Sequence, residues 1–350
     1  MSKTYKISLD NLPKLYAHMA GLRNLYLPIR RGGTLNFEKW HEDATVDLHG
    51  LKTVNTPKDL FLPQSENLYT AKMTGTDIEI IAQDFFDKPF VIFGVKACDI
   101  EAINVLDNIY LSKQPVDMFY EARRQNAVLV SLACNAPKNA CFCSAFGLDA
   151  SNPGGDVTTW IKDDHLYIQG QNDKGNAFVD EMTSLLESAN HEDLADLQAN
   201  IRQITQNLPY ANLPLNKDFS SESMMKYFSH ENWGNLHRAC IGCGACTYIC
   251  PTCSCYDIKD YDGKSNGVTR FRCWDSCMYP DFTLMAHGNN RLTQKERFRQ
   301  RFMHKLMYHP MNYEGQFGCV GCGRCINKCP VALNIVKIIK SLEVKVDADV

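Results

Sequence analysis

CIGCGACTYICP (Cys240–Pro251) and CVGCGRCINKCP (Cys319–Pro330) carry the same spacing of four cysteines and a final proline. In both stretches the pattern is C-x2-C-x2-C-x3-C-P, which is the ligand spacing for cubane 4Fe-4S clusters. Three closely spaced thiolates surround one cluster, and the fourth, displaced by one more residue, reaches a second cluster. The two stretches therefore predict a pair of clusters that exchange their fourth ligands.

This exchange assigns eight cysteines as metal ligands. The first predicted cluster is held by Cys240, Cys243, Cys246 and Cys329, and the second by Cys319, Cys322, Cys325 and Cys250. Glycines between the ligands permit the positive φ angles that let backbone amides approach the sulfides. The alternative is a pair of zinc sites, but zinc typically takes paired C-x2-C knuckles on separate arms. The spacing therefore favours cubane clusters.

The composition indicates a globular protein with a sizeable core and little net charge. The chain has 350 residues, 45% of them hydrophobic, and this length suits two or three domains. A formal net charge of -3 provides no basic field for phosphate backbones, so we expect no nucleic acid partner.

Hydropathy and cysteine content bear on the cellular location. No run approaches the roughly 18 apolar residues of a membrane span, and the first residues lack the pattern of a signal peptide. We therefore expect no membrane span and a cytoplasmic protein. Sixteen cysteines in such a chain are typical of metal ligands or redox groups, because cytosolic thiols are kept reduced.

The first two hundred residues predict a mixed α/β domain. PFVIFGV (Pro89–Val95) and NAVLVSLAC (Asn126–Cys134) are typical of buried strands, and HLYIQG (His165–Gly170) alternates like a half-buried one. Between the first two, DIEAINVLDNIYL (Asp99–Leu111) has apolar residues at helical spacing, which predicts a strand-helix-strand unit. Residues 177–206 are polar, have few helix breakers and favour a helix.

A linker-like segment, Asn207–Ser223, separates this region from the cysteine-rich part of the chain. We place the domain boundary near residue 215, giving a mixed α/β domain of residues 1–215 and a cluster-binding domain of residues 216–350. Helices are expected over Thr293–Tyr308 and after Pro330. The long spacer and helical flanks resemble the α-helical ferredoxin-like domain of fumarate reductase iron-sulfur subunits and heterodisulfide reductase subunits.

Four further cysteines lie in the first domain. Cys98 and Cys134 each follow a predicted strand, and CFC supplies Cys141 and Cys143 shortly afterwards. Parallel neighbouring strands bring the first two to one sheet edge, with the loop close by. The functional interpretation is a third 4Fe-4S cluster, and the alternative is four separate buried cysteines that pack as small apolar side chains.

The last four cysteines follow no standard ligand spacing. Cys253 and Cys255 lie in PTCSCYD, and Cys273 and Cys277 lie in RCWDSC. They indicate either a further cluster or a site for sulfur chemistry, or else free thiols that pack near the clusters.

Five stretches together resemble a known family, the subunits A of anaerobic sulfite reductases and the beta subunits of cytosolic sulfhydrogenases. They are, in chain order, IFGVKACDIEAINVLDNIYL, NACFC, CIGCGACTYICPTCSCY, WDSCMYP and CVGCGRCINKCP. The resemblance runs from about Phe90 to Leu342. Within it Cys253, Cys255 and Cys277 match positions of the family pattern, whereas Cys273 does not.

The resemblance implies a non-catalytic electron-transfer component of an oxidoreductase complex. Such subunits relay single electrons between a flavin-containing, NAD(P)H-binding subunit and a catalytic subunit of the siroheme sulfite reductase or nickel-iron hydrogenase type. The residues agree, since several one-electron centres occur without a motif for substrate chemistry. The alternatives are a chain that itself reduces sulfur or polysulfide at the extra cysteines, and a zinc-bound interaction module.

Overall fold

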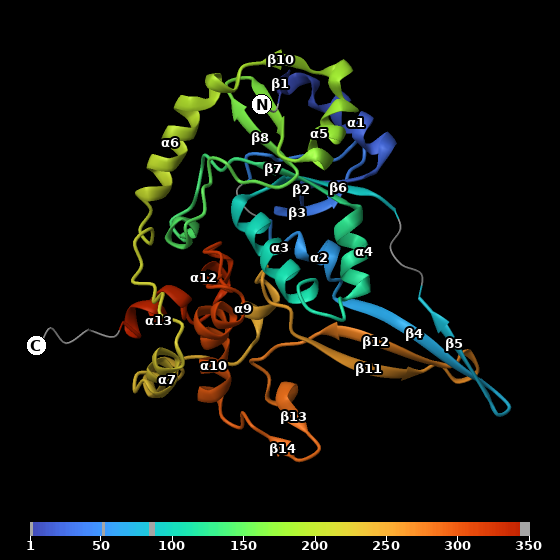
Figure 1. The fold of residues 1–350 in the computed structure, drawn as a ribbon, viewed down its shortest axis with the longest axis vertical. Helices are drawn as coiled ribbons and strands as arrows, with labels where there is room; N and C mark the ends of the chain where they lie inside the picture. Colours follow the sequence, from blue (N-terminus) through green and yellow to red (C-terminus); the bar gives the residue numbers. More distant parts are fainter. Residues whose placement is uncertain (1–2, 51–52, 84–87, 344–350) are drawn as a thin grey trace, which may run out of the picture. The chain divides into compact units, whose positions relative to one another are not determined.

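The computed structural model describes residues 3–50, 53–83 and 88–343. The chain forms two compact units (Figure 1). The first unit comprises Met1–Pro57, Asp87–Asn212 and Cys319–Gly323, and the second comprises Lys58–Phe86, Leu213–Gly318 and Arg324–Val350. Each unit is therefore assembled from segments that lie far apart in the sequence.

The first unit is built on an eight-stranded sheet with the order β10-β1-β9-β8-β7-β6-β2-β3. Its strands are β1 Thr4–Ser8, β2 Asn24–Arg31, β3 Thr34–Lys39, β6 Phe90–Val95, β7 Ala127–Leu132, β8 Val157–Lys162, β9 His165–Gly170 and β10 Glu187–Ala189. Strands β2, β6, β7 and β8 run parallel to one another, and the outer pairs are antiparallel. Mixed α/β architecture is thus confirmed for this unit.

Five α-helices among the described residues of the first unit lie between its strands in the sequence or follow the last strand. They are α1 Leu12–Leu22, α3 Ala97–Tyr110, α4 Met118–Asn126, α5 Asp173–Asp180 and α6 Ala195–Gln206. Helices α3 and α4 lie between the parallel strands β6 and β7, and α3 is the helix that the sequence predicts there, so the strand-helix-strand unit is confirmed. Both strands are buried along their whole length, as their continuous apolar runs predict.

One prediction for this unit is wrong. Residues 177–206 do not form one helical stretch, because the short strand β10 lies between α5 and α6. Thr4 and Lys6 of β1 pair with Ala189 and Glu187 of β10. The backbone hydrogen bonds gained by extending the sheet outweigh the helix preference of these polar residues.

The second unit contains a four-stranded antiparallel sheet with the order β11-β12-β4-β5. Its strands are β4 Ser65–Thr74, β5 Asp77–Ala82, β11 Tyr256–Asp262 and β12 Val268–Trp274, which form one long ribbon in Figure 1. A buried ion pair joins Arg272 of β12 to Glu66 of β4 at 2.6 Å. Two hairpins from distant parts of the sequence are thereby held as one sheet.

The other elements of the second unit are mostly short. Its helices are α2 Lys58–Phe61, α7 Ser221–Ser229, α8 Trp233–Leu236, α9 Ala245–Tyr248, α10 Gln294–Met303, α11 His309–Asn312, α12 Arg324–Lys328 and α13 Ile335–Ser341, with a small hairpin of β13 Leu284–Met285 and β14 Gly288–Asn289. The predicted helix from Thr293 begins with a capping box between Thr293 and Glu296 and continues through a turn of π-helix at His304–Tyr308. Among the described residues, every helix is too short or too polar to cross a bilayer.

The turn before β8 depends on a glycine at a point of close backbone approach. Gly155 has a φ of +90°, and a Cβ atom at this position would lie 3.0 Å from the carbonyl oxygen of Leu129. Gly147 also has a positive φ, +77°, but no atom lies within 4 Å of its Cβ position. At Gly147 a side chain would therefore cause backbone strain alone, whereas at Gly155 it would cause the same strain and a steric clash.

We expect Gly155→Ala to lower the thermal unfolding midpoint more than Gly147→Ala does. Both substitutions incur the cost of a left-handed backbone, on the order of 1–2 kcal/mol, but only Gly155→Ala also forces β7 away from the turn. Calorimetry on the two variants tests this difference. Equal decreases would show that the turn tolerates a side chain.

Candidate metal centre

Four cysteines of the second unit line a single cavity. They are Cys240, Cys243, Cys246 and Cys329, the four that the ligand-exchange rule assigns to the first cluster. The remaining lining is largely apolar and includes Phe298 and Phe302 of α10. The fold thus places the fourth cysteine of the second motif beside the first three of the first motif.

Backbone geometry in the first motif leaves room beside these thiols. Gly242 and Gly244 have φ angles of +69° and +71°, and a Cβ atom on Gly244 would lie 2.7 Å from the hydroxyl of Tyr279. Gln294 donates a hydrogen bond to the Cys240 sulfur at 3.3 Å, and the Leu333 amide donates one to the Cys329 sulfur at 3.3 Å. Hydrogen bonds to ligand sulfurs stabilise the thiolate form and tune cluster potential.

An aromatic group packs behind this cavity. Trp233 lies edge-on to Phe298 and stacked on Phe302, with ring centroids 6.2 and 6.4 Å apart. Trp233 and Phe302 are both buried. Phe298 and Phe302 form part of the apolar wall of this cavity, and Trp233 packs against both rings.

Arg301 places a positive charge within the same wall. Its side chain is only 4% exposed, and its Nε has no hydrogen-bond partner among the described residues. Burial lowers the pKa of Arg301, but the nearby thiols, with Cys246 and Cys325 contributing most, raise it above its usual value overall. A buried cation of this kind requires nearby negative charge. Thiolates of an anionic 4Fe-4S cluster supply such charge, so these residues fit the group.

The predicted ligands of the second cluster divide between the two units. Cys250 and Cys325 belong to the second unit, where both thiols influence Arg301. Cys319 and Cys322 belong to the first unit, where Cys322 packs in a buried group with Cys98 and Cys143. Each unit therefore contains two of the four predicted ligands of the second cluster.

The N-terminal cysteines lie where the parallel sheet predicts. Strands β6 and β7 are parallel neighbours, Cys98 lies in the first turn of α3 just after β6, and Cys134 follows β7. Both thiols lie near the ammonium of Lys96. Burial lowers the pKa of Lys96, and the charges of Cys134 and Cys98 oppose that effect.

The loop that carries Cys141 and Cys143 packs directly on the start of the second motif. The Phe142 amide donates to the Gly321 carbonyl at 2.9 Å. Cβ atoms on Gly321 and Gly323 would lie 2.4 and 2.2 Å from the carbonyl oxygens of Phe142 and Ala140. This close contact explains why both positions need glycine. The cysteine spacing alone did not predict it.

Three of the four remaining cysteines gather with Cys250. Cys253 interacts with Cys250, and the Cys255 thiolate accepts hydrogen bonds from the thiol and backbone N–H of Cys277. These bonds lower the pKa of Cys255 to about 7, while the pKa of Cys277 is raised. Cys273 instead lies on β12 opposite Asp257. The pattern separates Cys273 from the other three, as the family resemblance does.

Two buried lysines accompany this group. Lys305, in the π-helical turn, donates to the Thr252 hydroxyl at 2.7 Å and to the Gly318 carbonyl at 3.0 Å. Lys58 donates to the Cys253 carbonyl at 3.1 Å and lies 3.6 Å above the Trp274 ring. Burial lowers the pKa of Lys58, and the charges of Cys253 and Cys250 oppose this. Sequence reasoning missed both lysines, because nothing in their local sequence marks them as buried.

In the part of the chain that the structure describes, no three His, Cys, Asp or Glu side chains are arranged to hold a single metal ion. A cubane distributes its four ligands over four irons. The four cysteines that line the cavity of the first motif are therefore compared with a four-iron cluster and not with a single metal ion.

Comparison with known proteins identifies this part of the chain as a 4Fe-4S dicluster domain. Residues 239–333 match the 4Fe-4S dicluster domain family, which spans both cysteine motifs. The chain is also 32% identical over 337 residues to the sulfhydrogenase 2 subunit beta of Pyrococcus furiosus, covering 95% of this chain and 96% of that protein. The chain belongs to the family of sulfhydrogenase beta subunits, so the predicted resemblance is confirmed.

We expect Cys329→Ser to reduce the iron content of the protein by about four per chain, because it removes a thiolate from the first cluster. Cys273→Ser is the matched control and is expected to leave the iron content unchanged. Iron analysis of anaerobically purified variants measures both. Unchanged iron in Cys329→Ser would contradict the exchange of the fourth ligand.

Proposed function

We propose that this chain is the iron-sulfur electron-transfer subunit of a multi-subunit oxidoreductase. The observation that carries the proposal is the single cavity lined by Cys240, Cys243, Cys246 and Cys329. Bound 4Fe-4S clusters supply one-electron acceptors and donors that need no bond to substrate. The relative from Pyrococcus furiosus is itself named as a subunit, which supports the presence of partner subunits here.

The proposal assigns three clusters to the chain. The ligands are Cys240, Cys243, Cys246 and Cys329 for the first, Cys319, Cys322, Cys325 and Cys250 for the second, and Cys98, Cys134, Cys141 and Cys143 for the third. Residues 216–350 act as the dicluster domain, and residues 1–215 carry the third cluster. Helices α9, α10, α12 and α13 beside the motifs support an α-helical ferredoxin-like arrangement of the dicluster domain.

The chain's own residues hold the clusters, exclude water and balance charge. Phe298 and Phe302 keep the first cavity apolar, and Arg301 offsets the negative charge of its thiolates. In the cytoplasm, such a subunit passes electrons between a flavin-containing, NAD(P)H-binding partner and a catalytic partner. The catalytic partner is of the siroheme sulfite reductase or nickel-iron hydrogenase type.

A second candidate function is reduction of sulfur or polysulfide by this chain itself. The observation that favours it is the gathering of Cys253, Cys255 and Cys277, with Lys305 influencing all three. Thiols held near a positive charge are typical of sites for sulfur chemistry.

We expect the isolated chain to accept electrons from reduced methyl viologen without sustained production of sulfide from polysulfide. Loss of the visible cluster absorption reports the electrons accepted, and a sulfide assay reports turnover. Sustained turnover that Cys277→Ser abolishes and Cys273→Ser preserves would support the second candidate. Clusters that viologen cannot reduce would contradict an electron-transfer role.

We expect Arg301→Met to lower the midpoint potential of at least one cluster by on the order of 60 mV, because reduction adds negative charge beside a cation that is now missing. Redox titration followed by electron paramagnetic resonance measures the potential. Arg301→Lys, which keeps the charge, restores most of the shift.

Arg299→Met is the control on the same helix. The Arg299 guanidinium lies 3.6 Å above the Phe228 ring and donates to the Phe228 carbonyl at 3.2 Å, and no thiol is among these partners. Its variant should keep the original potentials. Equal shifts in Arg299→Met and Arg301→Met would show that Arg301 has no specific effect on the clusters.

A further inference from the structure

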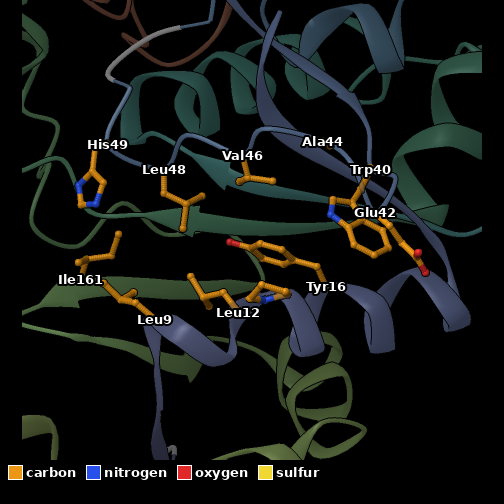
Figure 2. A pocket seen from close by; sticks show the side chains of 11 residues that line it. Leu9, Leu12, Tyr16, Trp40, Glu42, Ala44, Val46, Leu48, His49 and Ile161 are labelled. Carbon is orange, nitrogen blue, oxygen red and sulfur yellow. The ribbon is translucent and has the colours of Figure 1, made fainter.

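The first unit contains a cavity of about 340 Å³ that no cysteine lines. It lies between α1, the segment from Trp40 to His49 and the end of β8 (Figure 2). Its walls are mostly apolar and include Leu12, Val46, Leu48 and Ile161. Small-molecule sites typically have this size and lining, with a few polar groups that orient the ligand.

One buried polar group points into this cavity. Tyr16 is only 4% exposed, and Figure 2 shows its hydroxyl directed toward the space below Val46 and Leu48. That hydroxyl has no hydrogen-bond partner among the described residues. Burying a hydroxyl without a hydrogen-bond partner is energetically unfavourable. Among the described side chains that line this cavity, the Tyr16 hydroxyl is therefore the buried polar group available to orient a ligand.

The protonation and position of Tyr16 determine what it can bind. The Tyr16 phenol is protonated at neutral pH, as tyrosines ordinarily are, and burial raises its pKa further, so its hydroxyl can donate a hydrogen bond. An edge contact with Phe93, with ring centroids 5.9 Å apart, fixes the ring. A ligand group at this point must therefore present an acceptor atom.

The rim limits the charge and shape of a ligand. Glu42 and His49 line opposite ends of the cavity and are exposed (Figure 2). The carboxylate of Glu42 disfavours an anionic ligand. Since Tyr16 requires a hydrogen-bond acceptor, a neutral acceptor such as a carbonyl oxygen meets both conditions. Trp40 adds a second aromatic ring to the lining, and aromatic rings pack well against flat ligands.

We propose that this cavity binds a small, flat, neutral molecule that is mostly apolar and places a carbonyl oxygen against the hydroxyl of Tyr16. The proposal concerns a second site on the chain, separate from its cysteines, and it does not depend on the electron-transfer role. A carbonyl acceptor satisfies the unpartnered hydroxyl, and the apolar body of the ligand fills the space between the walls.

The test compares two probes that differ in one group, the bicyclic ketone 1-tetralone and its hydrocarbon counterpart tetralin. Dissociation constants are measured by titration calorimetry on the full-length, anaerobically purified protein. Wild type should bind 1-tetralone more tightly than tetralin. Tyr16→Phe should weaken 1-tetralone about tenfold and leave tetralin unchanged, because only the ketone loses a hydrogen bond.

Tyr120→Phe is the matched control. Tyr120 is fully buried in the same unit, but its hydroxyl donates to Asp107 at 2.7 Å and it does not line the cavity. This variant should bind both probes as wild type does and should unfold at a lower temperature. Tyr16→Phe should unfold at the wild-type temperature or above, since it removes a hydroxyl that has no partner.

Four results would overturn the proposal. One is failure of wild type to bind 1-tetralone, and another is equal affinity of wild type and Tyr16→Phe for this ketone. The third is unchanged binding in Ala44→Trp, a substitution that fills the cavity with a large side chain and should abolish binding of both probes. A lower unfolding temperature in Tyr16→Phe would also count against it, because the hydroxyl would then already have a partner.

Discussion

Positive charge buried beside cysteine thiols is the constraint on which the second unit depends. Arg301 and Lys305 are each only 4% exposed and lie on consecutive turns of one helical segment. A buried guanidinium or ammonium is strongly destabilising unless negative charge and hydrogen bonds surround it. The thiols provide that charge, and Thr252 and Gly318 provide oxygen acceptors for Lys305. Folding of this unit and loading of its metal are therefore expected to be coupled.

In the first unit, the parallel sheet brings together cysteines that are far apart in the sequence. Parallel strands β6 and β7 end at the same sheet edge, so Cys98 and Cys134 arrive together near Lys96. The loop with Cys143 is then held by backbone contacts with the two glycines of the second motif. The second motif thus differs from the first in its structural role, because its residues Cys319–Gly323 form part of the first unit.

Local sequence patterns predicted much of this arrangement. Strands β6 and β7 and helix α3 follow from continuous apolar runs and a helical period, which are local signals. The four cysteines around the first cavity follow from ligand spacing, which records the geometry of the cluster itself. The strand and helix signals and the spacing within each motif are local, whereas the assignment of Cys329 to the first cluster depends on the exchange of fourth ligands between the two motifs.

Other features have no local signal. Pairing of β4 with β12 joins residues about two hundred positions apart, and the burial of Lys58 follows from that long-range assembly. Residues 177–206 look helical by composition, yet β10 pairs with β1 at the sheet edge. The cavity around Tyr16 is equally invisible in sequence, because a tyrosine that lacks a partner resembles any other core tyrosine.

The account as a whole depends on iron and sulfide being bound by these cysteines. The most direct test is the content of iron, acid-labile sulfide and zinc in wild-type protein purified without oxygen. Three cubanes predict about twelve irons and about twelve sulfides per chain. Stoichiometric zinc without iron or sulfide would contradict the electron-transfer role, and the cysteine motifs would then be structural zinc sites.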